Sequence, residues 1–172
     1  MSTILVAAIL VGSVVAICIF LISIHNKHKR EAMNHLLNQF SQAGTENNLS
    51  FSSQEVLNNS VLGLDGLNRK ILVVRKQDHE YTSLIIDLNE VQTCVVKKIY
   101  RTIKSDSYKE GKLEQYLEQI VLHFDLGGKP SVEIVFYKNH DNHIYETQEL
   151  EQKARHWEAI LSKMHAPVKN IA

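Results

Sequence analysis

The sequence predicts an α+β protein: an N-terminal transmembrane helix, then an antiparallel six- to seven-stranded barrel or bent sheet, capped by a C-terminal amphipathic helix. Three observations favour this fold class. Residues 4 to 24 form an uncharged apolar run. Near residue 50 the spacing of apolar residues changes from about 3.6, typical of a helix, to 2, typical of a strand. One helical apolar stripe then lies close to the C-terminus.

The apolar run has the length of a membrane span. Ile4 to Ile24 is 21 residues, and no charged side chain precedes Lys27. As a helix this segment would be about 31 Å long, which matches the hydrocarbon core of a bilayer. A cleaved signal peptide would have a shorter apolar run and a small-residue cleavage site. We therefore expect residues 1 to 26 to be a transmembrane anchor.

Small residues recur at every fourth position of this run, at Ala8, Gly12 and Ala16. In a helix they lie on one face and allow a second helix to approach closely. The spacing predicts a helix–helix contact within the membrane, either a homodimer or a contact with a partner helix.

A basic flank, HNKHKR at residues 25 to 30, follows the run. Basic residues next to a span stay on the cytoplasmic side. The sequence thus predicts a single-pass protein of the cell membrane, with its N-terminus outside and its soluble domain in the cytoplasm. The opposite orientation, with an outside-facing domain, is the main alternative. Cys18 and Cys94 have no evident pairing, which suits a reducing compartment.

Between the anchor and the soluble domain we expect a juxtamembrane helix and linker, residues 27 to 48. Four apolar residues recur there at helical spacing: Met33, Leu36, Leu37 and Phe40. The stretch QAGTENN, residues 42 to 48, has little to bury and predicts a break. The soluble domain is then residues 49 to 172.

The sequence of the soluble domain predicts a series of consecutive strands. Residues 61–65 and 69–76 flank a turn-prone segment and predict a hairpin. Further strands are expected at 81–88, 91–101, 117–126 and 131–138, with a short segment at 143–145. Because no helix long enough for a parallel crossover separates most of them, antiparallel pairing is expected. The polar stretch 102 to 112 shows no strand pattern and is interpreted as a loop between two strands.

The C-terminal helix begins near Thr147, a plausible N-cap. Its apolar residues form one stripe, namely Leu150, Ala154, Trp157, Leu161 and Met164. We expect this stripe, with the only tryptophan of the chain, to close a hydrophobic opening of the sheet.

Three segments together resemble a bacterial pleckstrin-homology-like (PH-like) domain on a single-pass membrane anchor: VLGLDGLNRKILVV, LIIDLNEVQTCVV and LEQKARHWEAILSKM. The resemblance covers about two thirds of the chain and implies a strongly bent sheet plugged at one end by the last helix. Lipid-reading members of that family have a basic cluster around the first hairpin. Here the first strand ends in Asp65, and Arg69 and Lys70 are adjacent rather than alternating, which departs from that pattern.

Candidate chemistry is sparse. His140 and His143 are two residues that could ligate a metal, but Asn and Asp between them are typical of a turn, and no cysteine lies nearby. Cys94 has no patterned base beside it, and Asp65 with Gly66 is foremost a turn signal. We expect no enzyme, no cofactor and no metal.

Function is predicted from charge and topology. With 19 basic and 19 acidic side chains, nucleic acid is not expected as a partner. The prediction is a membrane-tethered, non-catalytic binding module, an adaptor or accessory subunit that recruits an unidentified protein through a sheet edge or groove. The alternative is an anionic-lipid-sensing domain at the cytoplasmic face. Its lipid contacts would be Arg69, Lys70, Lys97, Lys98, Arg101 and Lys104.

Overall fold

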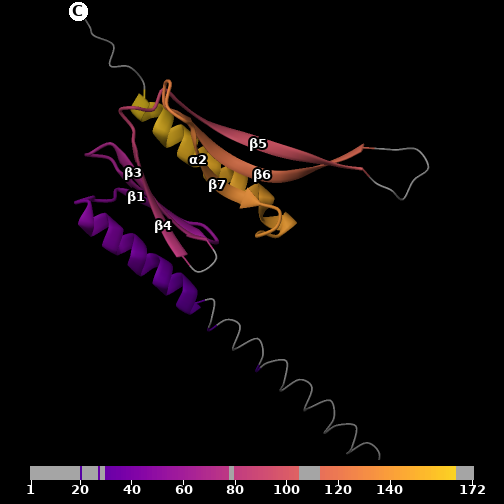
Figure 1. Cartoon of the computed structure of the whole chain (residues 1–172), viewed down its shortest axis with the longest axis horizontal. Coiled ribbons are helices and arrows are strands. Elements are labelled where there is room, and N and C mark those ends of the chain that lie inside the picture. Colours follow the sequence, from indigo (N-terminus) through magenta and orange to yellow (C-terminus); the bar gives the residue numbers. More distant parts are fainter. Residues whose placement is uncertain (1–19, 21–26, 28–29, 78–79, 105–112, 166–172) are drawn as a thin grey trace, which may run out of the picture.

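The computed structural model describes residues 20, 27, 30–77, 80–104 and 113–165. Within them the chain forms two antiparallel sheets and two helices (Figure 1). An N-terminal helix, residues 30–46, precedes the sheets. The remaining elements are β1 (Ser53–Val56), β2 (Ser60–Asp65), β3 (Lys70–Gln77), β4 (Glu80–Asp87), β5 (Thr93–Lys104), β6 (Leu113–Asp125), β7 (Val132–Lys138), the 3-10 helix η1 (Ile144–Glu146) and α2 (Thr147–His165).

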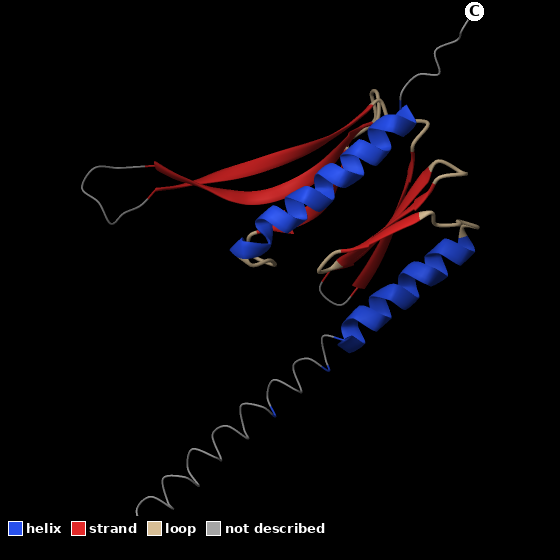
Figure 2. Cartoon of the chain, turned by 180° about the vertical axis from the view of Figure 1, so that it is seen from behind, coloured by secondary structure: helices blue, strands red, loops and turns tan. Residues whose placement is uncertain are grey.

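The first four strands form one sheet in the order β1-β2-β3-β4, and the last three form another in the order β5-β6-β7. The N-terminal helix lies along the four-stranded sheet, while α2 lies against the three-stranded one (Figure 2). Buried residues of both sheets and of α2 join in one hydrophobic core.

The predicted single barrel or bent sheet is wrong. The chain is α+β, but β4 and β5 do not pair with each other, and neither sheet closes into a barrel. The reason lies in the connection between them, where Leu88 and Val91 are buried. The Leu88 N–H donates to the Arg69 carbonyl in the first sheet, and the Gln92 N–H donates to the Asp125 carbonyl in the second. The two ends of this connection are therefore held by different sheets.

The predicted single-pass membrane topology is also corrected. In the part of the chain that the structure describes, no helix has both the length and the apolar character needed to span a bilayer. That finding contradicts the transmembrane, single-pass localisation. Apart from Phe20, the run on which the prediction rested lies outside the described residues.

Most predicted strands lie where expected, with β6 and β5 longer than their periodic cores. The sequence reading missed β1, a four-residue strand that pairs with β2 from Ser53 opposite Leu64 to Val56 opposite Val61. The segment at 143–145 is not a strand, because residues 144–146 form the 3-10 helix. Most of the polar stretch 102 to 112 lies outside the described residues.

The N-terminal helix is part of the fold. Its buried Leu36 and Phe40 pack on Val61, Leu72 and Val74, which point away from the main core. These contacts cover the outer face of the four-stranded sheet. The predicted break at residues 42 to 48 is wrong in part, because the helix continues to residue 46.

Two glycines make room for this contact. A side-chain carbon at Gly44 would lie 2.7 Å from the Phe51 ring, and one at Gly63 would lie 2.7 Å from the same ring and would also collide with Phe40. The two phenyl rings stack with their centroids 4.6 Å apart. Glycine at these positions therefore lets the aromatic pair lie flat between the helix and the sheet.

Helix α2 completes the main core as its periodicity predicted. Leu150, Ala154, Trp157 and Leu161 are buried, and Met164 packs against the same cluster. A hydrogen bond also fastens the helix to the edge strand β5, because the Val96 N–H donates to the Glu158 carboxylate at 2.8 Å. Further ties are the ion pairs of Lys98 with Glu151 and of Lys153 with Glu55.

Asp65 organises the turn between β2 and β3. This buried carboxylate accepts hydrogen bonds from the backbone N–H groups of Asn68 and Ser50 and from the Asn68 side-chain amide, all at 2.8 Å. These donors, the Asn68 N–H foremost, lower the pKa of Asp65 to about 2. Arg69 completes the turn with a positive φ of 52°.

The three-stranded sheet is irregular at two places. Glu118 is an extra residue of β6 opposite the junction of Ile99 and Tyr100, and Phe136 is an extra residue of β7 opposite the junction of Ile120 and Val121. Such bulges bend a strand and redirect its side chains. As a result, the neighbours Phe136 and Tyr137 are both buried. Beyond the bulge in β6, the ribbon of β5 and β6 extends away from the body (Figure 1).

Candidate functional site

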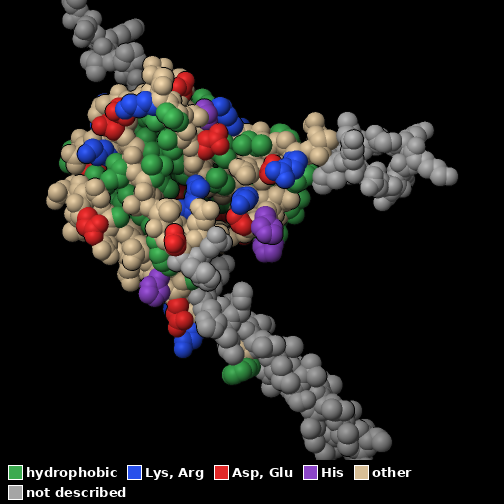
Figure 3. All heavy atoms as spheres, viewed as in Figure 1, with side chains coloured by type: hydrophobic (Ala, Val, Ile, Leu, Met, Phe, Trp, Pro, Cys, Tyr) green, Lys and Arg blue, Asp and Glu red, His purple; other side chains and the backbone are tan. Residues whose placement is uncertain are grey.

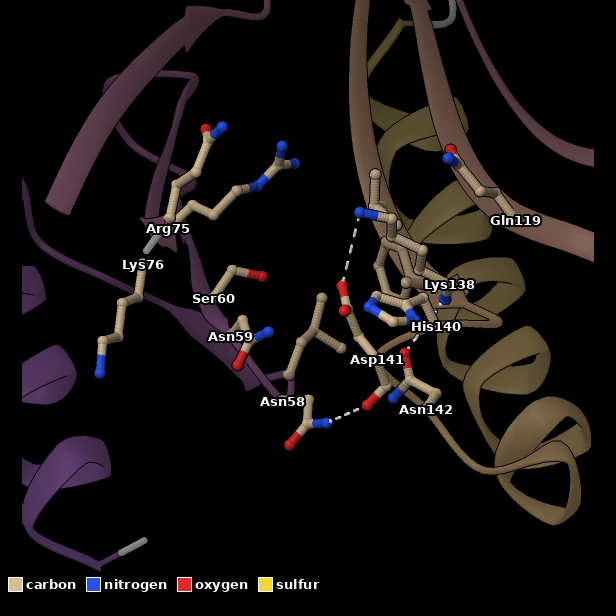
Figure 4. Close-up of a pocket in the computed structure, with 14 residues that line it drawn as sticks. Asn58, Asn59, Ser60, Arg75, Lys76, Gln119, Lys138, His140, Asp141 and Asn142 are labelled. Atoms are coloured by element: carbon tan, nitrogen blue, oxygen red, sulfur yellow. Dashed lines mark hydrogen bonds and ion pairs between the residues drawn. The ribbon is translucent and has the colours of Figure 1, made fainter. Parts of the chain in front are cut away.

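A cleft of about 540 Å³ opens between the two sheets, at the end of β3 and alongside β7 (Figure 4). Its lining is mostly polar and comes from segments far apart in the sequence. The residues are Leu57, Asn58, Asn59, Ser60, Arg75, Lys76, Gln77, Gln119, Val135, Phe136, Lys138, His140, Asp141 and Asn142.

The β1–β2 connection and the end of β3 form one wall. The Leu57 N–H donates to the Ser60 carbonyl, which closes a tight turn, and the Lys76 N–H donates to the Asn59 carbonyl at 2.8 Å. Along β3, Ile71 and Val73 point into the main core, so the alternation of a strand also directs Arg75 to that side. Arg75 lies beyond the last core residue on that side of β3, Val73, and faces the cleft (Figure 4).

The end of β7 and the turn that follows it form the other wall. The N–H groups of Asp141 and Asn142 both donate to the Lys138 carbonyl at 2.9 Å, and the Lys138 N–H donates to the Asn142 side chain at 3.1 Å. Lys138 Nζ lies 3.7 Å from the Asp141 carboxylate. The turn is therefore held by its own hydrogen bonds.

One hydrogen bond joins the two walls. The Asn58 side-chain amide donates to the Asp141 carbonyl at 2.8 Å, across 83 positions of sequence (Figure 4). It fixes the separation of the two sheets at the mouth of the cleft.

The cleft has a positive balance. Arg75, Lys76 and Lys138 are cationic, and Asp141 is the single carboxylate among the described residues of the lining. Lys138 has Asp141 as its counter-ion, whereas Arg75, a half-buried residue, has no hydrogen-bond acceptor or ion-pair partner for its guanidinium among the described residues. An arginine in this state is ready to bind a carboxylate or phosphate, because its planar fork matches either anion.

The six residues predicted to contact lipid lie elsewhere and are not brought together. Arg69 donates from its guanidinium to the Met164 carbonyl at 2.6 Å, at the C-terminal end of α2. Lys98 binds Glu151 at 2.6 Å, near the N-terminal end of the same helix. Those two anchor points are thirteen positions apart along the helix, or about 20 Å. Arg69 and Lys98 therefore contact α2 at opposite ends of the helix.

The other four are equally dispersed. Arg101 forms an ion pair with Glu118 at 2.7 Å on the projecting ribbon. Lys97 is exposed on the outer face of the three-stranded sheet, in register with Val121. Lys70 lies at the start of β3, opposite Asp87, and Lys104 ends β5. On the face seen in Figure 3, basic side chains are interspersed with acidic ones.

Ala8, Gly12 and Ala16, the predicted helix–helix contact within a membrane, lie outside the described residues. The structure gives no placement for that contact.

His140 and His143, the two residues considered as metal ligands, lie in different surroundings. His140 lines the cleft, whereas His143 stacks on Tyr145 with ring centroids 5.1 Å apart. No group of three or more His, Cys, Asp or Glu side chains suited to a metal occurs within the described ranges.

Two groups have strongly shifted pKa values, and both shifts oppose catalysis. Burial, with the nearby Glu158 carboxylate, raises the pKa of the Cys94 thiol to about 12, so it stays protonated and is a poor nucleophile. The pKa of Asp65, at about 2, keeps that residue ionised and unable to act as a general acid near neutral pH.

The sequence reading missed Arg75, although a signal for it was present. Ile71, Val73 and Arg75 have the same parity on one strand, so a cation occupies a position where the alternation predicts a core-facing side chain. Such a residue marks the place where a core ends in a cavity. The other wall could not be found this way, because it depends on the bulges and on the docking of the two sheets.

Comparisons of this chain with family models, with curated proteins and with solved structures found no match.

Proposed function

We propose that this chain is a non-catalytic binding module whose cleft holds an acidic segment of a partner protein. One observation supports this above the others: the half-buried Arg75 guanidinium has no acceptor among the described residues. An arginine without an acceptor from its own chain is available to an anion, because its planar guanidinium matches a carboxylate. Binding of a carboxylate would supply the missing partner, and Lys76 and His140 are also among the residues that line the cleft.

The size and polarity of the cleft suit such a ligand. A volume of about 540 Å³ accommodates a few peptide residues. Side-chain amides and a hydroxyl alternate along both walls, namely Asn58, Asn59, Ser60, Gln77, Gln119 and Asn142. These groups can donate to peptide carbonyls and accept from peptide N–H groups. Asn58 and Asn142 already form hydrogen bonds within the protein, and an apolar ligand would offer no partner to the other polar groups.

The frame of the cleft also favours binding. The hydrogen bond from Asn58 to the Asp141 carbonyl and the one from the Lys76 N–H to Asn59 fix both walls before a ligand arrives. A preformed site loses less conformational entropy on binding than a mobile one. The shifted pKa values of Cys94 and Asp65 further support binding over catalysis.

The test is a titration of the full-length chain into a fluorescein-labelled hexaglutamate peptide, followed by fluorescence anisotropy. We expect saturable binding, weakened roughly tenfold or more by Arg75→Gln, since a hydrogen bond to a charged group contributes about 1.5–3 kcal/mol. Lys97→Gln is the matched control, because it removes one charge from the outer face of the three-stranded sheet. Equal losses in the two variants would show general attraction to charge and would contradict the proposal.

The same protein should be tested against vesicles of phosphatidylcholine with and without phosphatidylserine. Binding to the anionic vesicles that depends on Arg75, without binding to the peptide, would mean that the ligand of the cleft is a lipid headgroup and not a protein segment. Circular dichroism of each variant shows whether the fold is intact.

A further inference from the structure

Four of the described strands lie at a sheet edge. Three of them have features that hinder pairing with a further strand. β1 is only four residues long, and its Glu55 is paired with Lys153. On β5, the Val96 N–H is taken by Glu158 of α2. β7 is interrupted by its bulge at Phe136. Short length, covering side chains and bulges are the usual means by which proteins keep an edge from pairing with another chain.

β4 is the exception. It pairs along all eight residues with β3, without a bulge, and within the described residues β3 is the only strand hydrogen-bonded to it. Its sequence EYTSLIID has no proline, lysine or arginine. Leu84 is 43% exposed and the adjacent Ile85 is 37% exposed, on opposite faces of the strand. Such a long, regular, partly apolar edge favours pairing with a further strand.

We propose that β4 pairs antiparallel with β4 of a second copy of this chain, about a two-fold axis through Ser83, so that the two four-stranded sheets become one continuous sheet. In an isologous contact each residue meets its symmetry counterpart. An axis through Ser83 places Tyr81 opposite Ile85, Thr82 opposite Leu84 and Glu80 opposite Ile86.

The strand is self-complementary in this register. Like faces meet, because residues of equal parity are opposite each other. Tyr81 and Ile85 form an aromatic and β-branched pair twice, and such pairs stabilise antiparallel ladders. Glu80 faces Ile86 rather than another acid. An axis midway between Ser83 and Leu84 would instead oppose Glu80 and Asp87 and would set core-facing residues against outward-facing ones. This complementarity is what selects a second copy as the occupant.

The inference is independent of the proposed function. No residue of β4 lines the cleft, so the cleft stays open in the paired form.

Disulfide trapping tests the register. In the full-length chain with Cys18→Ser and Cys94→Ala, we expect Ser83→Cys to form a covalent dimer on mild oxidation. Directly opposed residues have Cα atoms about 4.5–5.5 Å apart, within reach of a disulfide. Thr82→Cys is the matched control, since its two copies would be diagonal, about 7–8 Å apart, and should remain largely uncrosslinked. Equal trapping at both positions, or trapping only at Leu84→Cys, would overturn the proposed register.

Sedimentation equilibrium of the chain without introduced cysteines tests the association itself. We expect the average mass to rise with concentration toward that of a dimer, and Leu84→Lys to raise the dissociation constant at least tenfold. Val95→Lys is the control, because Val95 has a similar exposure, 39%, on β5. A mass that stays at one chain up to millimolar concentration, or equal effects of the two lysines, would overturn the proposal. The result does not depend on peptide binding, so it can fail while the cleft proposal stands.

Discussion

The two sheets differ in how they are covered. The two central strands of the four-stranded sheet, β2 and β3, are buried on both faces, by the main core on one side and by the N-terminal helix on the other. The three-stranded sheet has α2 and the main core on one face, while its other face exposes Val95 and Lys97. The first sheet is therefore a middle layer, and the second is an outer one (Figure 2).

This difference appears in the sequences of the strands. All six residues of β2 are buried, and β3 has four consecutive buried residues, Ile71 to Val74. A strand buried on both faces has a continuous apolar run rather than alternation. In β4, by contrast, Ser83 is exposed while Ile86 is buried. An uninterrupted apolar sequence in a strand therefore indicates that both faces of the sheet are covered. Here the second covering layer is the N-terminal helix.

The sheets differ in regularity as well. The ladder of β2, β3 and β4 runs without a register shift, whereas β6 and β7 each have an extra residue. The regular four-stranded sheet includes β4, the edge strand that is open to further pairing. The irregular three-stranded sheet includes β7, which forms one wall of the cleft. The comparison yields five predictions, in order of decreasing effect.

Replacing Trp157 with alanine should be the most damaging change. The side chain is buried in the cluster that joins α2 to both sheets, so its loss removes packing on the outer sheet and in the shared core. We expect the free energy of unfolding to fall by about 4 kcal/mol, measured by urea denaturation. His156→Ala, at the exposed neighbouring position, should change it little. A small effect at Trp157 would mean that α2 does not hold the sheets together.

Phe40→Ala should uncover the middle layer. The buried ring packs between the N-terminal helix and β2, and we expect a loss of about 3 kcal/mol. Hydrogen exchange should show faster exchange of amides in residues 30–46, while amides of α2 retain their protection. Equal loss of protection in both helices would contradict the separation of the two covering layers.

Gly63→Ala tests the close approach of helix and sheet. The new methyl group would collide with Phe40 and lie 2.7 Å from Phe51, and overpacking of this kind costs about 1–3 kcal/mol. The melting temperature of the variant provides the measurement. In a Phe40→Ala background the same substitution should cost less, because one of the two colliding rings is gone.

Asp65→Asn should change the acid dependence of stability. The pKa of Asp65 is about 2 in the folded chain against an ordinary value of 3.8, so the folded state binds its proton less readily. The stabilisation is complete above pH 3.8 and is lost as the pH falls toward 2. Urea midpoints between pH 2 and 5 should therefore fall more steeply for the natural chain than for Asp65→Asn. Parallel curves would show that the Asn68 and Ser50 donors do not act on this carboxylate.

Arg101→Gln should have the smallest effect. Its ion pair with Glu118 lies on the projecting ribbon, where the arginine side chain is well exposed. Such pairs contribute about 0.5 kcal/mol and are screened by salt. We expect a change in the urea midpoint near the limit of measurement, which 0.5 M NaCl should abolish. A larger loss would indicate that the ribbon packs on the body.

The C-terminal helix shows what periodicity can predict. Its stripe, from Leu150 to Met164, and the burial of Trp157 follow from local spacing alone, and the structure confirms them. The positions of β3, β5 and β7 were predicted for the same reason, because side-chain alternation is a property of a single strand.

Other features depend on distant parts of the chain. Arg69, for example, donates a hydrogen bond to the carbonyl of Met164, 95 positions away, which no local pattern predicts. The N-terminal helix was predicted as a juxtamembrane helix and linker that could lie against the membrane surface or against the domain. Its partner is the outer face of β2 and β3, which only the completed sheet creates.

The sequence by itself determined most of the strands, the last helix, the turn at Asp65 and the apolar stripe of the N-terminal helix, since each depends on residues only a few positions apart. Only the tertiary structure decided that the strands divide into two sheets, that the first helix covers one of them, and that Arg75 faces a cleft. These features depend on where the chain crosses between sheets and where single extra residues bend β6 and β7. The free-energy differences behind those choices arise from packing across the whole core, which no local pattern records.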